Sequence, residues 1–187
     1  SHDAGTANCL QLRGEYLYVA EGRRGVRVYD VASIANKGVS QGIISAPFSP
    51  LGQDTHIDTQ DATCIALPTN QPVNPRRNQG ELMRVTNLEQ PFHPIYNYAV
   101  IADAKEGLIL ADVTTLVDGE PRNNQLKRTL TWNGGGILTG ARHVTLGGYY
   151  AYVMADAGLV IVSLNDPLQP SVVATVPLSG GQSSALQ

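Results

Sequence analysis

Apolar and polar positions alternate in short runs along this chain, and three stretches share one layout. Each has an apolar segment that ends in alanine and an acidic residue, then a short turn, then glycine and a second apolar segment. The three read EYLYVAEGRRGVRVYDV (15–31), NYAVIADAKEGLILADV (97–113) and YAYVMADAGLVIVSL (150–164). Short runs rich in β-branched and aromatic residues, bounded by Gly, Asn, Asp and Pro, are typical of β-strands. No stretch keeps an apolar period of 3.6 residues, so we expect almost no helix.

The three stretches are the centres of a longer repeat in which each unit is expected to hold four strands. The strand before each hairpin is expected at CLQL, CIAL and HVTL, which begin at Cys9, Cys64 and His143. The strand after each hairpin is expected in VSQGIIS, LKRTLTW and SVVATVPL, which begin at Val39, Leu126 and Ser171. The turn glycines, where a tight hairpin requires a positive φ, are Gly25, Gly107 and Gly158.

Four antiparallel strands per repeat predict the blade of a β-propeller. The fold class is therefore predicted to be all-β, an arc of about three four-stranded blades. A β-sandwich of the same strands is the alternative, which explains the strands but not the repeat. The predicted divisions are a first blade at 1–47, a second at 48–133 with an insertion at about 69–95, a third at 134–178, and a linker or tail at 179–187.

Three blades do not close a propeller, which typically has four to eight. An open arc would expose an apolar blade face at each end, and such faces associate or aggregate. We therefore expect the chain to be a fragment of a longer protein or one component of an assembly that completes the ring. The expected partners are the remaining blades or neighbouring subunits.

Composition, charge and the absence of catalytic motifs argue against several classes of function. The chain has 187 residues, of which 42% are hydrophobic and 16% charged, and its formal net charge is −3. This balance fits a folded globular protein and lacks the basic stripe of a nucleic-acid binder. No apolar run approaches the roughly 20 residues that span a bilayer, so no membrane span is expected. The motifs HExxH, SxxK and the P-loop do not occur, so a non-catalytic role is favoured.

Cys9, Cys64 and His143 are the first candidate site, because they align at one position on three successive inner strands. Two thiolates and an imidazole can hold a soft metal ion. The alternative is that each is an ordinary half-buried strand residue. A disulfide is not expected, since equivalent positions on neighbouring blades should exceed the ~7 Å Cα separation that a disulfide allows.

The second candidate is the acidic loop DTHIDTQDA, in which Asp54, His56, Asp58 and Asp61 offer ligands for calcium. It lacks the spacing and glycine of an EF-hand, and a solvated turn whose aspartates bond its own backbone is the alternative. No other cofactor is expected in this segment.

The insertion at about 69–95 is the third candidate, because long loops on rigid scaffolds often carry recognition. Its Arg76, Arg77 and Arg84 suit acidic groups on a partner protein or a neighbouring domain. The alternative is a flap that covers a blade edge. A further repeated feature is the turn acids Glu21, Asp103 and Asp156, which we expect to bond turn amides and to serve the fold rather than catalysis.

The segment GLVIVSLNDPLQPSVVATV (158–176) resembles the LVIVD repeat family. That family has an aromatic–Ala–Tyr–Val strand, a glycine turn, LVIVD, then D-P-x-x-P and a fourth strand. Here Tyr150 begins the first strand, and Asp166, Pro167 and Pro170 match the third part. The last Asp of LVIVD is replaced by Ser163, whereas the other units keep Asp30 and Asp112.

The resemblance implies a β-propeller outside the cytoplasm: periplasmic, cell-surface or secreted. It defines no catalytic residues that can be carried over. The function expected is a non-catalytic binding or scaffold module of a secreted or cell-surface protein. One alternative is an accessory subunit or domain of an extracellular electron-transfer assembly with a multihaem cytochrome as partner, although this segment has no CxxCH haem motif of its own. The second is a propeller enzyme whose site lies in other blades.

Overall fold

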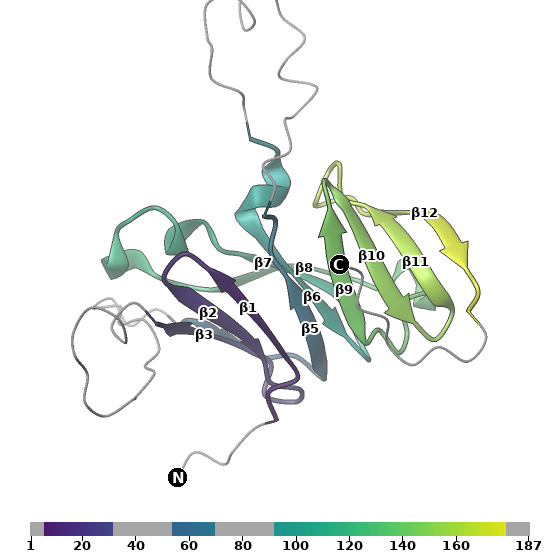
Figure 1. Cartoon of the computed structure of the whole chain (residues 1–187), viewed down its shortest axis with the longest axis horizontal. Coiled ribbons are helices and arrows are strands. Elements are labelled where there is room, and N and C mark those ends of the chain that lie inside the picture. The colour runs from purple at the N-terminus through teal and green to yellow at the C-terminus, as the bar shows by residue number, and fades with distance from the viewer. Residues whose placement is uncertain (1–5, 32–53, 70–91, 179–187) are drawn as a thin grey trace, which may run out of the picture.

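A computed structural model describes residues 6–31, 54–69 and 92–178, which form three four-stranded sheets (Figure 1). The first sheet has the order β1 (Cys9–Arg13), β2 (Tyr16–Ala20), β3 (Val26–Asp30), β4 (His56–Ile57). The second has the order β5 (Ala62–Ala66), β6 (Tyr98–Asp103), β7 (Gly107–Asp112), β8 (Lys127–Trp132). The third has the order β9 (His143–Gly147), β10 (Tyr150–Ala155), β11 (Gly158–Ser163), β12 (Ser171–Val176).

Neighbouring strands in every sheet are antiparallel, as in a propeller blade. The only helices in the described ranges are short 3₁₀ turns: η1 (Pro94–Asn97), η2 (Thr114–Leu116), η3 (Pro121–Asn123) and η4 (Gly134–Gly136). The inner strands β1, β5 and β9 come together near the middle of the molecule, whereas β12 lies at its outer edge (Figure 1). The prediction of an all-β fold built from propeller-like blades is confirmed.

The turn glycines explain why each hairpin closes as it does. Their φ angles are +77° at Gly25, +87° at Gly107 and +106° at Gly158, a region that other residues rarely adopt. A Cβ at these positions would lie 1.9, 2.8 and 2.3 Å from a backbone carbonyl oxygen of the fourth strand. Those oxygens belong to Ile57, Trp132 and Val176. Each glycine therefore permits both the turn and the close passage of the fourth strand.

The fourth strand of the first sheet is not where the sequence predicted it. β4 pairs with β3 through Val26 opposite Ile57 and Arg27 opposite His56. The segment from Val39 lies outside the described residues, and β4 lies beyond the division at residue 47. β4 takes the place of the fourth strand because its last residue, Ile57, passes over the turn glycine Gly25. The last residues of β8 and β12 pass over the turn glycines of their own sheets in the same way.

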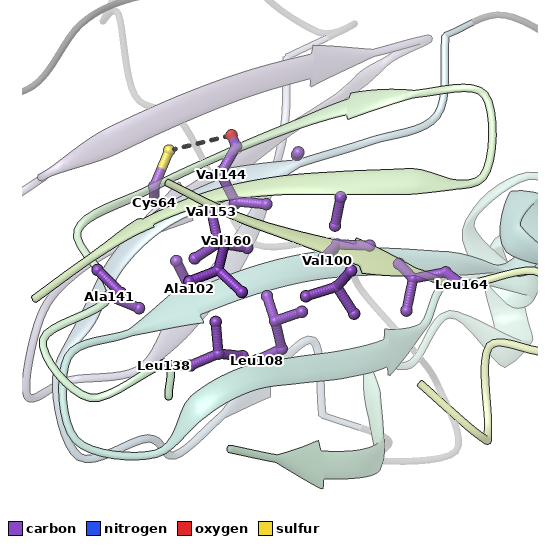
Figure 2. Packing of buried hydrophobic residues seen from close by; sticks show 14 of the residues in the cluster. Cys64, Val100, Ala102, Leu108, Leu138, Ala141, Val144, Val153, Val160 and Leu164 are labelled. Carbon is purple, nitrogen blue, oxygen red and sulfur yellow. Dashed lines mark hydrogen bonds between the residues drawn. The ribbon is translucent and has the colours of Figure 1, made fainter. Parts of the chain in front are cut away.

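The middle sheet is buried on both faces. Val100 and Ala102 of β6 and Leu108 of β7 pack toward Val153 and Val160 of the third sheet (Figure 2). The alternate residues face the first sheet in a second cluster, which includes Ile65, Ile101, Ile109, Tyr18 and Val28. Because side chains alternate across a strand, a sheet between two others needs apolar residues at consecutive positions. This accounts for the unbroken apolar run of β6.

Candidate functional site

Cys9, Cys64 and His143 occupy equivalent positions on the three inner strands β1, β5 and β9. In each sheet, one residue of the second strand lies opposite the turn glycine. Cys9, Cys64 and His143 each pair with the residue just before it in the sequence. Those pairing residues are Ala20, Ala102 and Met154. The equivalence inferred from the aligned segments is therefore seen in the hydrogen-bond register.

The structure brings these three side chains into one line of contacts. Cys9 Sγ lies 2.9 Å from Cys64 Sγ, and Cys64 Sγ lies 3.5 Å from His143 Nδ1. The backbone N–H of Ile65 donates to Cys9 Sγ at 3.2 Å, and the Cys64 thiol faces the carbonyl oxygen of Val144 (Figure 2). The two sulfur atoms meet because β1 and β5 pack directly against each other, and both thiols are free.

The geometry does not suit one metal ion bound by this trio. Two thiolates about 2.3 Å from a tetrahedral zinc would hold their sulfur atoms about 3.8 Å apart. The separation here is 2.9 Å. In the part of the chain that the structure describes, no group of three or more His, Cys, Asp or Glu side chains is arranged to hold a metal ion. The arrangement is that of a thiol pair with an adjacent imidazole.

The two thiols differ in acidity. The hydrogen bond with the Cys64 thiol, opposed by burial and assisted by the peptide N–H of Ile65, lowers the pKa of Cys9 to about 7. The same hydrogen bond, together with burial, raises the pKa of Cys64. Cys9 is partly exposed and Cys64 is buried. Cys9 is therefore the thiol that ionises first and that reagents reach.

Alkylation of the reduced chain by iodoacetamide tests this assignment. The rate at Cys9 should rise tenfold per pH unit below 7 and level off above it, because only the thiolate reacts. Replacing Cys64 with alanine should move the midpoint upward, toward the ordinary cysteine pKa of about 8.5, since it removes the main donor. Peptide mass spectrometry at each pH measures the rate at Cys9 separately. A midpoint near 8.5 in the unsubstituted chain would contradict the assignment.

A shallow pocket lies beside this cluster, on the side formed by the inner strands. Its volume is about 200 Å³, and it is lined by Gln11, Ala66, Leu67, Thr69, His143, Val144, Thr145 and Leu146. The sequence-based prediction missed Gln11 and Thr145. Both stand two residues after a member of the trio, and positions two apart share one face of a strand. That spacing could have identified them. Their amide and hydroxyl groups, with His143, can hydrogen-bond a small polar ligand.

The side chains of the acidic loop, as the described residues show them, are not gathered into a group of three or more that could hold a metal ion. Asp54 accepts the backbone N–H of His56 at 3.0 Å, and the His56 ring lies against the carbonyl oxygen of Arg24. Asp58 is exposed, whereas the backbone N–H of Asp61 donates to the Asp103 carboxylate. The four groups are therefore spread along the chain around β4, with Asp54 bonding its own turn.

The turn acids behave differently in the three sheets. Asp103 is fully buried, and its carboxylate accepts the backbone N–H groups of Lys105, Glu106 and Asp61 at 2.8, 2.8 and 2.6 Å. Glu21 accepts the hydroxyl of Tyr29 at 2.8 Å instead. The expected bonding of turn amides is seen at Asp103.

Asp156 does not occupy the position of Asp103, although the sequences align there. Asp103 pairs with Gly107, whereas the residue that pairs with Gly158 is Ala155. The third hairpin is one residue shorter, so Asp156 falls in the turn, with its side chain 72% exposed and 3.5 Å from Arg142. Arg76, Arg77 and Arg84 of the predicted insertion lie outside the described residues.

Comparison with known proteins adds one finding. The model of the LVIVD repeat family matches residues 4–38 and 140–177. The matched segments contain the hairpins of the first and third sheets. Among curated proteins, none matches the chain.

Proposed function

The chain carries LVIVD repeats, and from these and its blade-like sheets we propose a non-catalytic binding or scaffold module within a larger β-propeller. We propose further that the module acts outside the cytoplasm, because LVIVD repeats are typical of extracellular proteins. No helix among the described residues is long and apolar enough to cross a membrane. The electron-transfer role implied by the resemblance stays a prediction.

The observation that carries the proposal is the apolar outward face of each end sheet. On the first sheet, Leu10 and Leu12 are 55% and 63% exposed and point away from the second sheet. On the third sheet, Leu159 and Ile161 are half-buried on the outward face, next to the exposed Val176. The inward faces of the two end sheets are also apolar, and the middle sheet covers both of them.

These end faces fit further blades of the same fold. The interfaces already present show how such faces are covered, with one sheet stacking its apolar residues on the next (Figure 2). Stacking of this kind is how repeat proteins bury a continuous core. The further blades can come from the same polypeptide or from a neighbouring subunit, and the chemistry of the contact is the same.

Sedimentation of the whole 187-residue chain tests the proposal. We expect concentration-dependent association, which the double substitution Leu10→Ser and Leu12→Ser should weaken about a hundredfold or more, because each leucine contributes roughly 1.5 kcal/mol or more when buried. Val117→Ser is the matched control, since Val117 is also exposed but lies at the end of η2. A chain that stays monomeric at its highest soluble concentration would contradict the proposal, as would equal effects of the two variants.

A further inference from the structure

The sulfur atoms of Cys9 and Cys64 lie very close together, where the inner strands of the first two sheets meet. Their separation of 2.9 Å is shorter than a van der Waals contact of two sulfur atoms, and about 0.9 Å longer than a disulfide bond. The two residues are brought together although they lie on different sheets. The two sulfur atoms are therefore already in contact, and bond formation has to close a gap of about 0.9 Å.

We propose that Cys9 and Cys64 form an intramolecular disulfide that joins the inner strands β1 and β5. The surroundings of the pair favour this reaction. Cys9 is the accessible thiol, and the peptide N–H of Ile65, 3.2 Å from Cys9 Sγ, stabilises its thiolate. Cys64 is buried against Cys9, so an external reagent reaches it last.

The bond forms by thiol–disulfide exchange with a small-molecule or protein disulfide as the oxidant. The Cys9 thiolate attacks one sulfur of the oxidant, whose S–S bond breaks and releases one thiolate. That thiolate takes up a proton, and Cys9 is left in a mixed disulfide. The Cys64 thiol then gives its proton to His143 Nδ1, 3.5 Å away, and its sulfur attacks Cys9 Sγ. The second half of the oxidant leaves as a thiolate and takes that proton. In total, two protein thiols are oxidised and one disulfide is reduced to two thiols.

The acidity of the pair agrees with this order of events. The pKa of Cys9 is lowered to about 7 and that of Cys64 is raised, so Cys9 attacks the oxidant and Cys64 resolves the mixed disulfide. The product would connect two sheets that otherwise meet here through packing and a few bonds, such as Asn8 Nδ2 to the Ala62 carbonyl at 2.9 Å. Closing a long loop between residues 9 and 64 restricts the unfolded chain strongly.

The test oxidises the purified chain with oxidised glutathione under native conditions. Mass spectrometry should show the loss of two hydrogen atoms per chain and, after proteolysis without reductant, one cross-linked pair of peptides. The Tm should rise by about 5–15 °C, and dithiothreitol should reverse the rise. Comparing the same chain with and without reductant keeps the test valid even where a cysteine variant folds poorly.

Single variants separate the steps. Cys64→Ser should stop at the mixed disulfide of Cys9 with glutathione, whereas Cys9→Ser should leave Cys64 largely unmodified because it is buried. Neither variant should show the rise in Tm. The proposal is overturned if the folded wild-type chain keeps both thiols free, or stops at glutathionylated Cys9. It is also overturned if the reduced chain retains stoichiometric zinc that protects both thiols from oxidation.

Discussion

Replacing Gly158 with alanine is expected to lower the free energy of unfolding by about 4 kcal/mol. Gly158 has a φ of +106°, and forcing another residue into such a conformation costs about 1–3 kcal/mol. The new Cβ would also lie 2.3 Å from the carbonyl oxygen of Val176. β12 would have to move away, and overpacking of this kind costs a further 1–3 kcal/mol or so. Urea unfolding at equilibrium measures the loss.

Gly148→Ala is the matched control for this effect. Gly148 is an exposed turn glycine of the same sheet, with a φ of +62°, and a Cβ added there would meet no atom within 4 Å. The Gly148→Ala variant should lose only the free energy of unfolding that comes from the positive φ, about 1 kcal/mol. The difference between the two variants isolates the contact with β12. Equal losses would show that β12 does not pass over the turn glycine as described.

Replacing Asp103 with alanine is expected to cost about 3 kcal/mol or more. The substitution removes the acceptor of three backbone N–H groups, two in its own turn and one at Asp61 beside the neighbouring β5. Asp103 is fully buried, so the abandoned donors are poorly placed to reach water. A buried donor left without a partner costs about 1–3 kcal/mol, and the three losses are not strictly additive. Equilibrium denaturation of the purified chain measures the change.

Asp156→Ala is the control, because the sequence aligns Asp156 with Asp103 whereas the structure does not. Its side chain is 72% exposed, and its nearest cation, Arg142, is 3.5 Å away. Exposed ion pairs contribute roughly 0–1 kcal/mol, so little stability should be lost. A loss at Asp156 equal to that at Asp103 would mean that the two acids serve the same purpose despite their different pairing across the turn.

The amino-acid sequence alone was enough to determine the repeat and the class of fold. Short runs of β-branched and aromatic residues, bounded by Gly, Asn, Asp and Pro, indicated the strands. Glycine at positions 25, 107 and 158 indicated the hairpins because those turns need a positive φ. The alignment of Cys9, Cys64 and His143 followed from the same periodicity, and the register of β1, β5 and β9 agrees with it.

Only the tertiary structure decided which distant segments meet. β4 is a two-residue strand, too short to leave a periodic pattern, and is recognised only because its backbone bonds β3 and crosses Gly25. The exposure of Asp156 depends on pairing across the turn, because Ala155 and not Asp156 pairs with Gly158. The approach of Cys9 to Cys64 depends on how two sheets pack. Local propensity acts over a few neighbouring residues, whereas these features arise from hydrogen bonds and packing between segments far apart in the chain.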